Sequence, residues 1–384
     1  IRKYEEKEIY MIPIVDLKRQ YKQTGEEIEK AVVDVLRSGA YILGPNTKAL
    51  EQEFSQYLGT KHAIGLNSGT DALHLALRAL DIGKGDEVIT VAFTFVATTE
   101  SIEIVGATPV FVDIDPDTFN MDVTQIEDKI TPRTKAIMPV HLYGQPADMD
   151  VIMDIAKRHN LYVIEDCCQA VGAEYKGKKV GSFGDIGAYS FFPTKNLGGM
   201  GDGGMAVTNS DFLKDRMIAL RNHGGAVRYH HDEIGVNSRL DEIQSAILRV
   251  KMNYIDEWNK MRREVAHRYT ELFKDCEDVI TPKELDDTYC VYHQYTIKVP
   301  NRDAVQKMLQ ENGVGAMLYY PIPLHMQKVH AHLGYKMGDL PKTEYNTPHV
   351  MSLPMFAELT AEEQKEIATK VKDAIAKCKA TASC

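Results

Sequence analysis

A lysine in a glycine-rich loop is the strongest candidate nucleophile in this sequence. Lys195 closes the segment Ser190-Phe191-Phe192-Pro193-Thr194-Lys195, which ends a predicted strand and leads into Gly198 and Gly199. A lysine that is desolvated loses its proton more readily and can then form a Schiff base. Most loop lysines are simply solvated, so the prediction depends on which other groups reach the same place.

An acidic residue follows another predicted strand. Ile164-Glu165-Asp166 ends an apolar run, and ligands of parallel sheets bind outside the carboxyl ends of the strands. A carboxylate there could pair with the ring nitrogen of an electron-withdrawing cofactor and keep it protonated. The structural alternative for Asp166 is a helix cap.

The segment Asn67-Ser68-Gly69-Thr70-Asp71 follows a strand and opens a predicted helix. Backbone N–H groups, a hydroxyl and the helix dipole then converge on a volume suited to a phosphate. Alone, the pattern also fits a capped helix after a tight turn. An aromatic residue, Phe95, comes just after a further strand and adds a possible ring contact.

One glycine pattern is set aside. Gly199-Met200-Gly201-Asp202-Gly203-Gly204 matches the spacing of dinucleotide-binding loops, but it is predicted to lead into a strand instead of a helix. We therefore do not expect a nicotinamide site.

The elements that must position these groups alternate between short β-branched runs and helical patterns, which is typical of a parallel sheet covered on both faces. The predicted helices include 71–80, 148–159 and 211–220. The predicted strands are 62–66, 88–91, 109–112, 136–140, 162–165, 186–191 and 204–208.

A second, smaller unit is expected after the long helical pattern at 239–273, which predicts one helix or two nearly continuous ones. Beyond it, 292–299 reads as a strand, 302–311 as a helix and 361–377 as a terminal amphipathic helix. We predict a large α/β domain over 12–254 and a small C-terminal α/β domain over 255–384.

Composition excludes several classes of protein. The 384 residues carry a net charge of −10 and no basic stripe, so we expect no nucleic-acid partner. No apolar run approaches the roughly 20 residues of a membrane helix, and no secretory leader is visible, so we expect a soluble, cytoplasmic protein.

The six cysteines lack the paired spacing of a metal site. We expect them to be reduced thiols, and we expect no metal. Residues 1–10 are treated as a possible extension.

Together these motifs resemble the DegT/DnrJ/EryC1/StrS family of sugar aminotransferases, a branch of the fold-type I enzymes that use pyridoxal 5'-phosphate. The resemblance covers about residues 12–375. Besides the segments above, it rests on Phe93–Thr98, Glu165–Ala170, Gly235–Leu240 and Tyr320–His325. It implies a large domain with a mostly parallel seven-stranded sheet.

The resemblance also implies roles for single residues. Lys195 would hold the cofactor as a Schiff base, and Asp166 would pair with the pyridine nitrogen. Gly69, Thr70 and Ser190 would hold the phosphate, Phe95 (or Phe93) would stack on the ring, and Gln169 would lie near the phenolic oxygen. Asn237 would reach the phosphate from a neighbouring subunit, which implies a homodimer with shared active sites. His325, Tyr320 and Arg239 would lie on the substrate side.

The implied reaction moves an amino group from L-glutamate to a nucleotide-linked keto sugar and follows ping-pong kinetics. Family members that act as dehydratases carry histidine in place of Lys195, so transamination is expected. Gln169, where some members acting on 4-keto sugars carry histidine, favours a 3-keto-6-deoxyhexose together with the segment Tyr320–His325. A 4-keto sugar, a keto-uronic acid, an inositol-type ketone, or a non-catalytic regulatory role stay as alternatives.

Overall fold

A computed structural model gives the fold of the chain, and it describes residues 11–227 and 229–382. The possible extension at residues 1–10 and the thiol of Cys384 lie outside the described residues. Within the described part, no helix combines the length and apolar character that a membrane span requires. Cys167, Cys168, Cys276 and Cys290 carry free thiols, as predicted.

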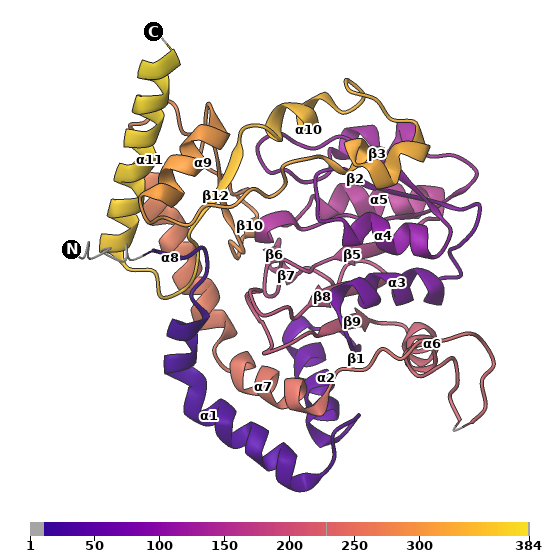
Figure 1. The fold of residues 1–384 in the computed structure, drawn as a ribbon. Helices are drawn as coiled ribbons and strands as arrows, with labels where there is room; N and C mark the ends of the chain where they lie inside the picture. Colours follow the sequence, from indigo (N-terminus) through magenta and orange to yellow (C-terminus); the bar gives the residue numbers. More distant parts are fainter. Residues whose placement is uncertain (1–10, 228, 383–384) are drawn as a thin grey trace, which may run out of the picture.

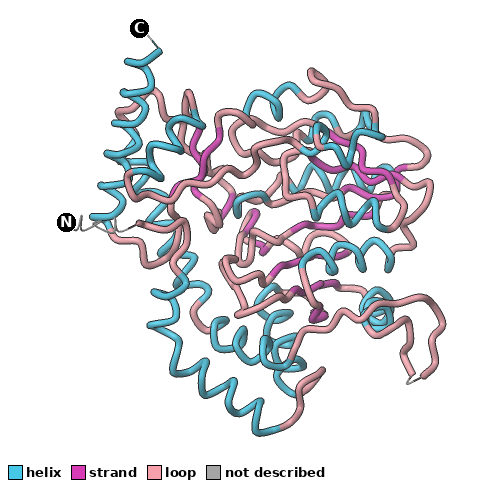
Figure 2. Tube along the Cα trace, in the orientation of Figure 1, coloured by secondary structure: helices cyan, strands magenta, loops and turns pink. Residues whose placement is uncertain are grey.

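The larger part of the molecule is built on a seven-stranded sheet (Figures 1 and 2), with the strand order β1-β9-β8-β5-β4-β2-β3. Only β9 runs antiparallel to its neighbours. All seven predicted strands form, with ends shifted by a few residues at most: β1 His62–Leu66, β2 Glu87–Val91, β3 Thr108–Val112, β4 Thr134–Ile137, β5 Tyr162–Asp166, β8 Ile186–Ser190 and β9 Gly204–Thr208.

Alternating side chains of these strands enter two separate cores, because successive residues of a strand point to opposite faces. Ile89 and Ile137 pack with α2 (Pro45–Leu58) and α5 (Met149–His159). Their neighbours Val88 and Ala136 pack in the other core, under α3 (Gly69–Ala79), α4 (Ala97–Ile104) and α6 (Asp211–Arg221). The sheet is therefore covered on both faces, as its β-branched runs predict.

A second region has its own apolar core between a two-stranded antiparallel sheet and three helices. The strands are β11 (Tyr295–Lys298) and β12 (Val350–Leu353). The helices are α8 (Ile255–Phe273), α9 (Arg302–Glu311) and α11 (Ala361–Ala382).

The chain passes from the first core to the second within one helix. Ile255 at the start of α8 packs in the large core, whereas Val265 and Tyr269 pack in the second. Ile12 also lies in the second core, where it pairs with Val314. The division at 254/255 stays a prediction; we propose that α8 is the rigid link between the two units.

The pattern at 239–273 forms two nearly continuous helices, α7 (Glu242–Met252) and α8, which is one of the two predicted alternatives. One predicted element differs in detail from the structure. The strand predicted at 292–299 begins only at Tyr295, because Tyr292 has a positive φ of 41° that a regular strand does not accommodate. The remaining elements are α1 Leu17–Ser38, β6 Glu174–Tyr175, β7 Lys178–Lys179, β10 Thr288–Tyr289 and α10 Pro341–Asn346.

Candidate active site

A pocket of about 400 Å³ lies at the carboxyl ends of β5 and β8, where the fold rule places ligands. Two sets of residues border it. The first, here called the sheet wall, follows the strands of the large sheet: Gly69, Thr70, Phe95, Asp166, Gln169, Ser190 and Lys195. The second, the C-terminal wall, consists of His293, Gln294, Tyr319 and Tyr320. Eight of the eleven predicted site residues thus meet in one cavity.

Lys195 sits in a tight loop just after β8. Its amide donates to Phe192 O at 2.8 Å, and the amide of Gly199 donates to Phe191 O at 2.7 Å. A Cβ at Gly198 would come within 2.3 Å of Pro193 O, so this turn closes only around glycine. Burial lowers the pKa of the Lys195 amine, although Cys168 and Asp166 nearby oppose the shift. More of this lysine is therefore the neutral, nucleophilic amine at neutral pH than in an ordinary surface lysine.

Asp166 ends β5 with its carboxylate buried and held from two directions. The Thr98 hydroxyl donates to Oδ2 at 2.9 Å, and the Cys168 amide donates to Oδ1 at 3.1 Å. These hydrogen bonds fix the orientation of the carboxylate, and Lys195 is the only lysine or arginine among the described residues that border the pocket. Asp166 is therefore available to a cationic ligand group such as a protonated ring nitrogen.

The start of α3 borders the pocket and has a geometry that suits an anion. The Ser68 hydroxyl caps the Asp71 amide at 3.0 Å, and the first helical hydrogen bond joins Ala72 N to Ser68 O. The amides of Gly69 and Thr70 precede that bond and border the pocket. A Cβ at Gly69 would meet Ser190 Cβ at 2.7 Å and Cys168 Sγ at 2.8 Å, so glycine lets the helix approach β8 closely.

The two candidate stacking rings, Phe95 and Phe93, differ in their burial. Phe95 borders the pocket and remains 54% exposed, with its ring centroid 6.2 Å from that of Tyr320. Phe93 is fully buried and stacks on Phe119 in the large core. Of these two phenylalanines, Phe95 is the one that borders the pocket and can offer a ring face to a ligand there.

Gln169 connects the two walls. Its Oε1 accepts from the Tyr143 amide at 2.8 Å, and its Nε2 donates to the Tyr320 hydroxyl at 3.2 Å. Both ends of the carboxamide are engaged, so the Tyr320 ring is positioned from the sheet side.

Three predicted residues lie outside the pocket lining of this chain. Asn237 pairs with Asn222 through the backbone, and Arg239 donates to Asn222 Oδ1 at 3.4 Å. His325 is buried, and its Nε2 lies 3.0 Å from Glu344 Oε1. His325 therefore does not border the pocket of this chain, and its contact with a sugar stays a prediction.

Sequence reasoning missed several supporting residues. Asn196 is buried and donates to Asn259 Oδ1 at 2.9 Å and to Val291 O at 3.0 Å, which anchors the lysine loop to distant segments. Thr98 orients Asp166. A polar side chain next to Lys195 in an otherwise apolar turn was a signal for Asn196, but its partners are far away in sequence.

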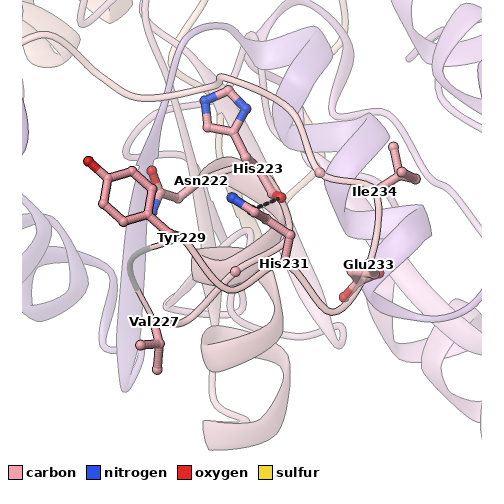
Figure 3. A pocket seen from close by; sticks show the side chains of 9 residues that line it. Asn222, His223, Val227, Tyr229, His231, Glu233 and Ile234 are labelled. Atoms are coloured by element: carbon pink, nitrogen blue, oxygen red, sulfur yellow. Dashed lines mark hydrogen bonds between the residues drawn. The ribbon is translucent and has the colours of Figure 1, made fainter.

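A larger hollow of about 550 Å³ lies elsewhere, in the loop after α6 (Figure 3). His231 Nδ1 lies 2.9 Å from His223 O and tightens this loop. Val227, Tyr229 and Ile234 are more than half exposed on it. None of the sheet-wall residues borders this hollow, so it is separate from the chemistry around Lys195.

A cluster of possible metal ligands near the sheet is a structural network. His141, Glu165 and Cys167 bring ligand atoms within 4.8 Å of one another. Glu165, however, accepts from the amides of Gly181, Phe183 and Gly184 at 2.6–2.8 Å and lies 3.1 Å from His141 Nε2. The other nitrogen of His141 accepts from the Ala147 amide at 3.0 Å. These groups are satisfied by the protein itself.

Comparisons with known proteins agree with this geometry. The model of the DegT/DnrJ/EryC1/StrS aminotransferase family matches residues 22–372. The "pleiotropic regulatory protein" of Geobacillus stearothermophilus is 52% identical over 94% of this chain and 97% of its own length. The "UDP-N-acetyl-3-dehydro-alpha-D-glucosamine 3-aminotranferase" of Acidithiobacillus ferrooxidans is 49% identical over 94% and 97%.

A solved structure has the same fold. The crystal structure of DesV from S. venezuelae, in complex with a ketimine intermediate, superposes with a TM-score of 0.93 at 40% identity and covers 95% of this chain and 98% of that one. The match extends over nearly the whole chain and includes the sheet that carries Lys195 and Asp166. This chain is a member of the DegT/DnrJ/EryC1/StrS aminotransferase family.

Proposed function

We propose that this enzyme moves an amino group from L-glutamate to the carbonyl of a nucleotide-linked keto sugar. The observation that carries the proposal is the meeting of Lys195, with its lowered pKa, and the buried Asp166 in one pocket beside the start of α3. A neutral amine, an oriented carboxylate and an anion cradle are the three groups that a pyridoxal-dependent transamination requires.

Pyridoxal 5'-phosphate is the cofactor, and the sheet wall fits it. Gly69, Thr70 and Ser190 would hold the phosphate, Phe95 would cover the ring, and Asp166 would keep the pyridine nitrogen protonated. When bound, the cofactor withdraws electrons from the carbon that loses its proton. Lys195 would anchor the cofactor covalently and, when its amine is free, would act as the base that moves the proton.

The keto sugar is proposed to carry its carbonyl at C3, with a 3-keto-6-deoxyhexose favoured. Support comes from Gln169, which stands where some relatives that act on 4-keto sugars carry histidine, and which holds Tyr320 in the pocket. A 4-keto sugar and a keto-uronic acid are the competing acceptors. Loading the enzyme with glutamate and offering each class of sugar nucleotide will decide, with amino-sugar formation followed by mass spectrometry.

We also propose a homodimer with shared active sites. Among the described residues that border the pocket, Lys195 is the only lysine or arginine, yet a phosphate, a nucleotide and two glutamate carboxylates all require cations or donors. The loop after α6 exposes Val227, Tyr229 and Ile234 and leads to Asn237 and Arg239, which have no place in their own pocket. A second copy could bring this loop to the site.

Mixed dimers test the shared site. Asn237→Asp should weaken cofactor binding by setting a carboxylate against the phosphate. When it is mixed with Lys195→Ala in freely exchanging dimers, some activity should return, because one of the two sites then combines intact halves. Absence of any recovery would contradict the intersubunit role of Asn237.

A non-catalytic regulatory protein is the rival function, favoured by the name of the Geobacillus relative. An absorbance spectrum of the purified protein separates the two. We expect a near-visible band from covalently bound cofactor, permanent attachment at Lys195 after borohydride treatment, and loss of the band with glutamate. A protein that binds no cofactor, or does not respond to glutamate, would support the regulatory role.

A further inference from the structure

Gln294 in the C-terminal wall is a buried polar side chain with an unmet hydrogen-bonding need. It is 7% exposed and borders the pocket, and its Oε1 has no hydrogen-bond partner in the described part of the chain. A buried acceptor without a partner costs about 1–3 kcal/mol. Such a group calls for a partner, either an ordered water or, where it borders a pocket, a bound ligand.

The second glutamine of the pocket shows the contrast. Gln169 uses Oε1 on the Tyr143 amide and Nε2 on the Tyr320 hydroxyl, and it therefore serves the protein's own structure. Next to Gln294, His293 Nδ1 is likewise engaged with Asn196 Oδ1 at 3.2 Å. Within this part of the pocket, the Gln294 oxygen is the acceptor left open for a ligand.

The chemistry of the ligands limits what can fill this position. An amide oxygen needs an O–H or N–H donor. The cofactor offers acceptors at its phosphate, and its ring N–H is taken by Asp166. Glutamate offers carboxylates, which are also acceptors, and an amine that reacts. The remaining donors are the hydroxyl or amide N–H groups of the sugar and the ribose hydroxyls and base N–H of the nucleotide. Gln294 borders the same pocket as Lys195, where the ketone would react, and this favours the donors of the sugar.

We propose that Gln294 is a specificity-determining residue whose Oε1 accepts a hydrogen bond from the substituent on a carbon that flanks the sugar's ketone. The inference rests on the proposed function, because it requires a keto sugar as acceptor. For a 3-keto sugar, the flanking donors are the hydroxyl or acetamido N–H at C2 and the hydroxyl at C4. A site that must satisfy a buried polar group discriminates against analogues that lack its partner.

The test uses the reverse sugar half-reaction, in which a 3-amino sugar nucleotide returns its amino group to the cofactor-loaded enzyme. The probes are a nucleotide-linked 3-amino-3,6-dideoxyhexose, its 4-deoxy analogue and its analogue with hydrogen at C2. Wild type should prefer the complete sugar over one of the two analogues by about tenfold, the usual size of one hydrogen bond. Gln294→Leu should lose that preference and leave the glutamate half-reaction within about twofold of wild type.

A binding measurement gives a readout independent of turnover. The amine form of the holoenzyme does not react with an amino sugar, so calorimetry can measure the dissociation constant directly. It should rise about tenfold in Gln294→Leu for the complete sugar and stay unchanged for the analogue that lacks the donor.

Gln145→Leu is the matched control. Gln145 is also buried with an unpartnered Oε1, but it does not border the pocket. This variant should lower the melting temperature and keep the wild-type sugar preference.

The outcomes separate the two proposals. Equal slowing of both half-reactions, or an unchanged sugar preference in Gln294→Leu, would overturn the role of Gln294 while the proposed function stands. If wild type reacts with glutamate but with no amino sugar nucleotide, the proposed function fails and the role of Gln294 fails with it.

Discussion

The sheet wall and the C-terminal wall of the pocket are built in different ways. Asp166 and Lys195 follow the ends of neighbouring parallel strands, so backbone pairing of β5 with β8 fixes their separation. Tyr319, Tyr320 and Gln294 lie on irregular chain beside a small two-stranded sheet. The first wall is held by a rigid scaffold and suits a cofactor common to a family; the second can change without disturbing the sheet and suits a substrate that varies.

The sharpest test of this contrast is at Lys195. Lys195→Ala should abolish amino transfer and leave the fold intact, because it removes both the covalent anchor and the base. Lys195→Arg should be equally inactive, since a guanidinium does not form a Schiff base. The prediction is confirmed if both variants lose the absorbance change that glutamate causes while the melting temperature of the apoenzyme stays unchanged. Turnover near wild type in either variant would end the mechanism.

Asp166→Asn should have the next largest effect, a rate reduction of about a hundredfold or more in both half-reactions. A neutral amide cannot hold the pyridinium proton, so the cofactor withdraws electrons poorly even when bound. Stopped-flow absorbance after mixing with glutamate measures the rate, and the spectrum before mixing reports cofactor occupancy. A variant within a few-fold of wild type would remove Asp166 from its assigned role.

Thr98→Val tests whether the sheet wall depends on residues that do not contact the cofactor but orient a residue that does. The change deletes the 2.9 Å hydrogen bond to Asp166 Oδ2 at nearly constant volume. A hydrogen bond to a charged group contributes about 1.5–3 kcal/mol, so both half-reactions should slow by about tenfold or more. Thr98→Ser, which keeps the hydroxyl, should restore most of the rate; if serine and valine behave alike, the hydroxyl has no part in positioning Asp166.

The sheet wall could be predicted from the sequence to a larger extent than the C-terminal wall. Strand ends in a parallel sheet are marked locally by β-branched runs followed by polar residues, so the sequence alone assigns Asp166, Lys195, Gly69 and Phe95 to one crevice. The structure adds that Phe95, and not the buried Phe93, borders this crevice.

The C-terminal wall carries no such local marker. Gln294 stands out only because its oxygen is buried without a partner among the described residues, a property that depends on the tertiary packing and not on local sequence. Asn196 supports the lysine loop through hydrogen bonds to Asn259 and to the backbone of Val291. These partners lie 63 and 95 residues away from Asn196 in the chain. Periodicity and motif spacing cannot reveal contacts of that kind.

The smallest effect on catalysis is expected at His325, where the sequence and the structure favour different roles. The resemblance placed this histidine against the sugar, which would make His325→Ala slow the sugar half-reaction far more than the glutamate half-reaction. In the structure, the His325 ring is buried, its Nε2 lies 3.0 Å from Glu344 Oε1, and its centroid lies 6.3 Å from that of Tyr335.

For His325→Ala we therefore expect both half-reactions to stay within about threefold of wild type. The free energy of unfolding should fall by about 2 kcal/mol, because packing and a hydrogen bond are lost. Glu344 would keep its bonds from the amides of Gly338 and Leu340, which limits the loss. Chemical denaturation measures the stability, and stopped-flow absorbance measures each half-reaction. A selective loss of the sugar step at unchanged stability would instead return His325 to the substrate pocket and show that the C-terminal wall rearranges when the sugar binds.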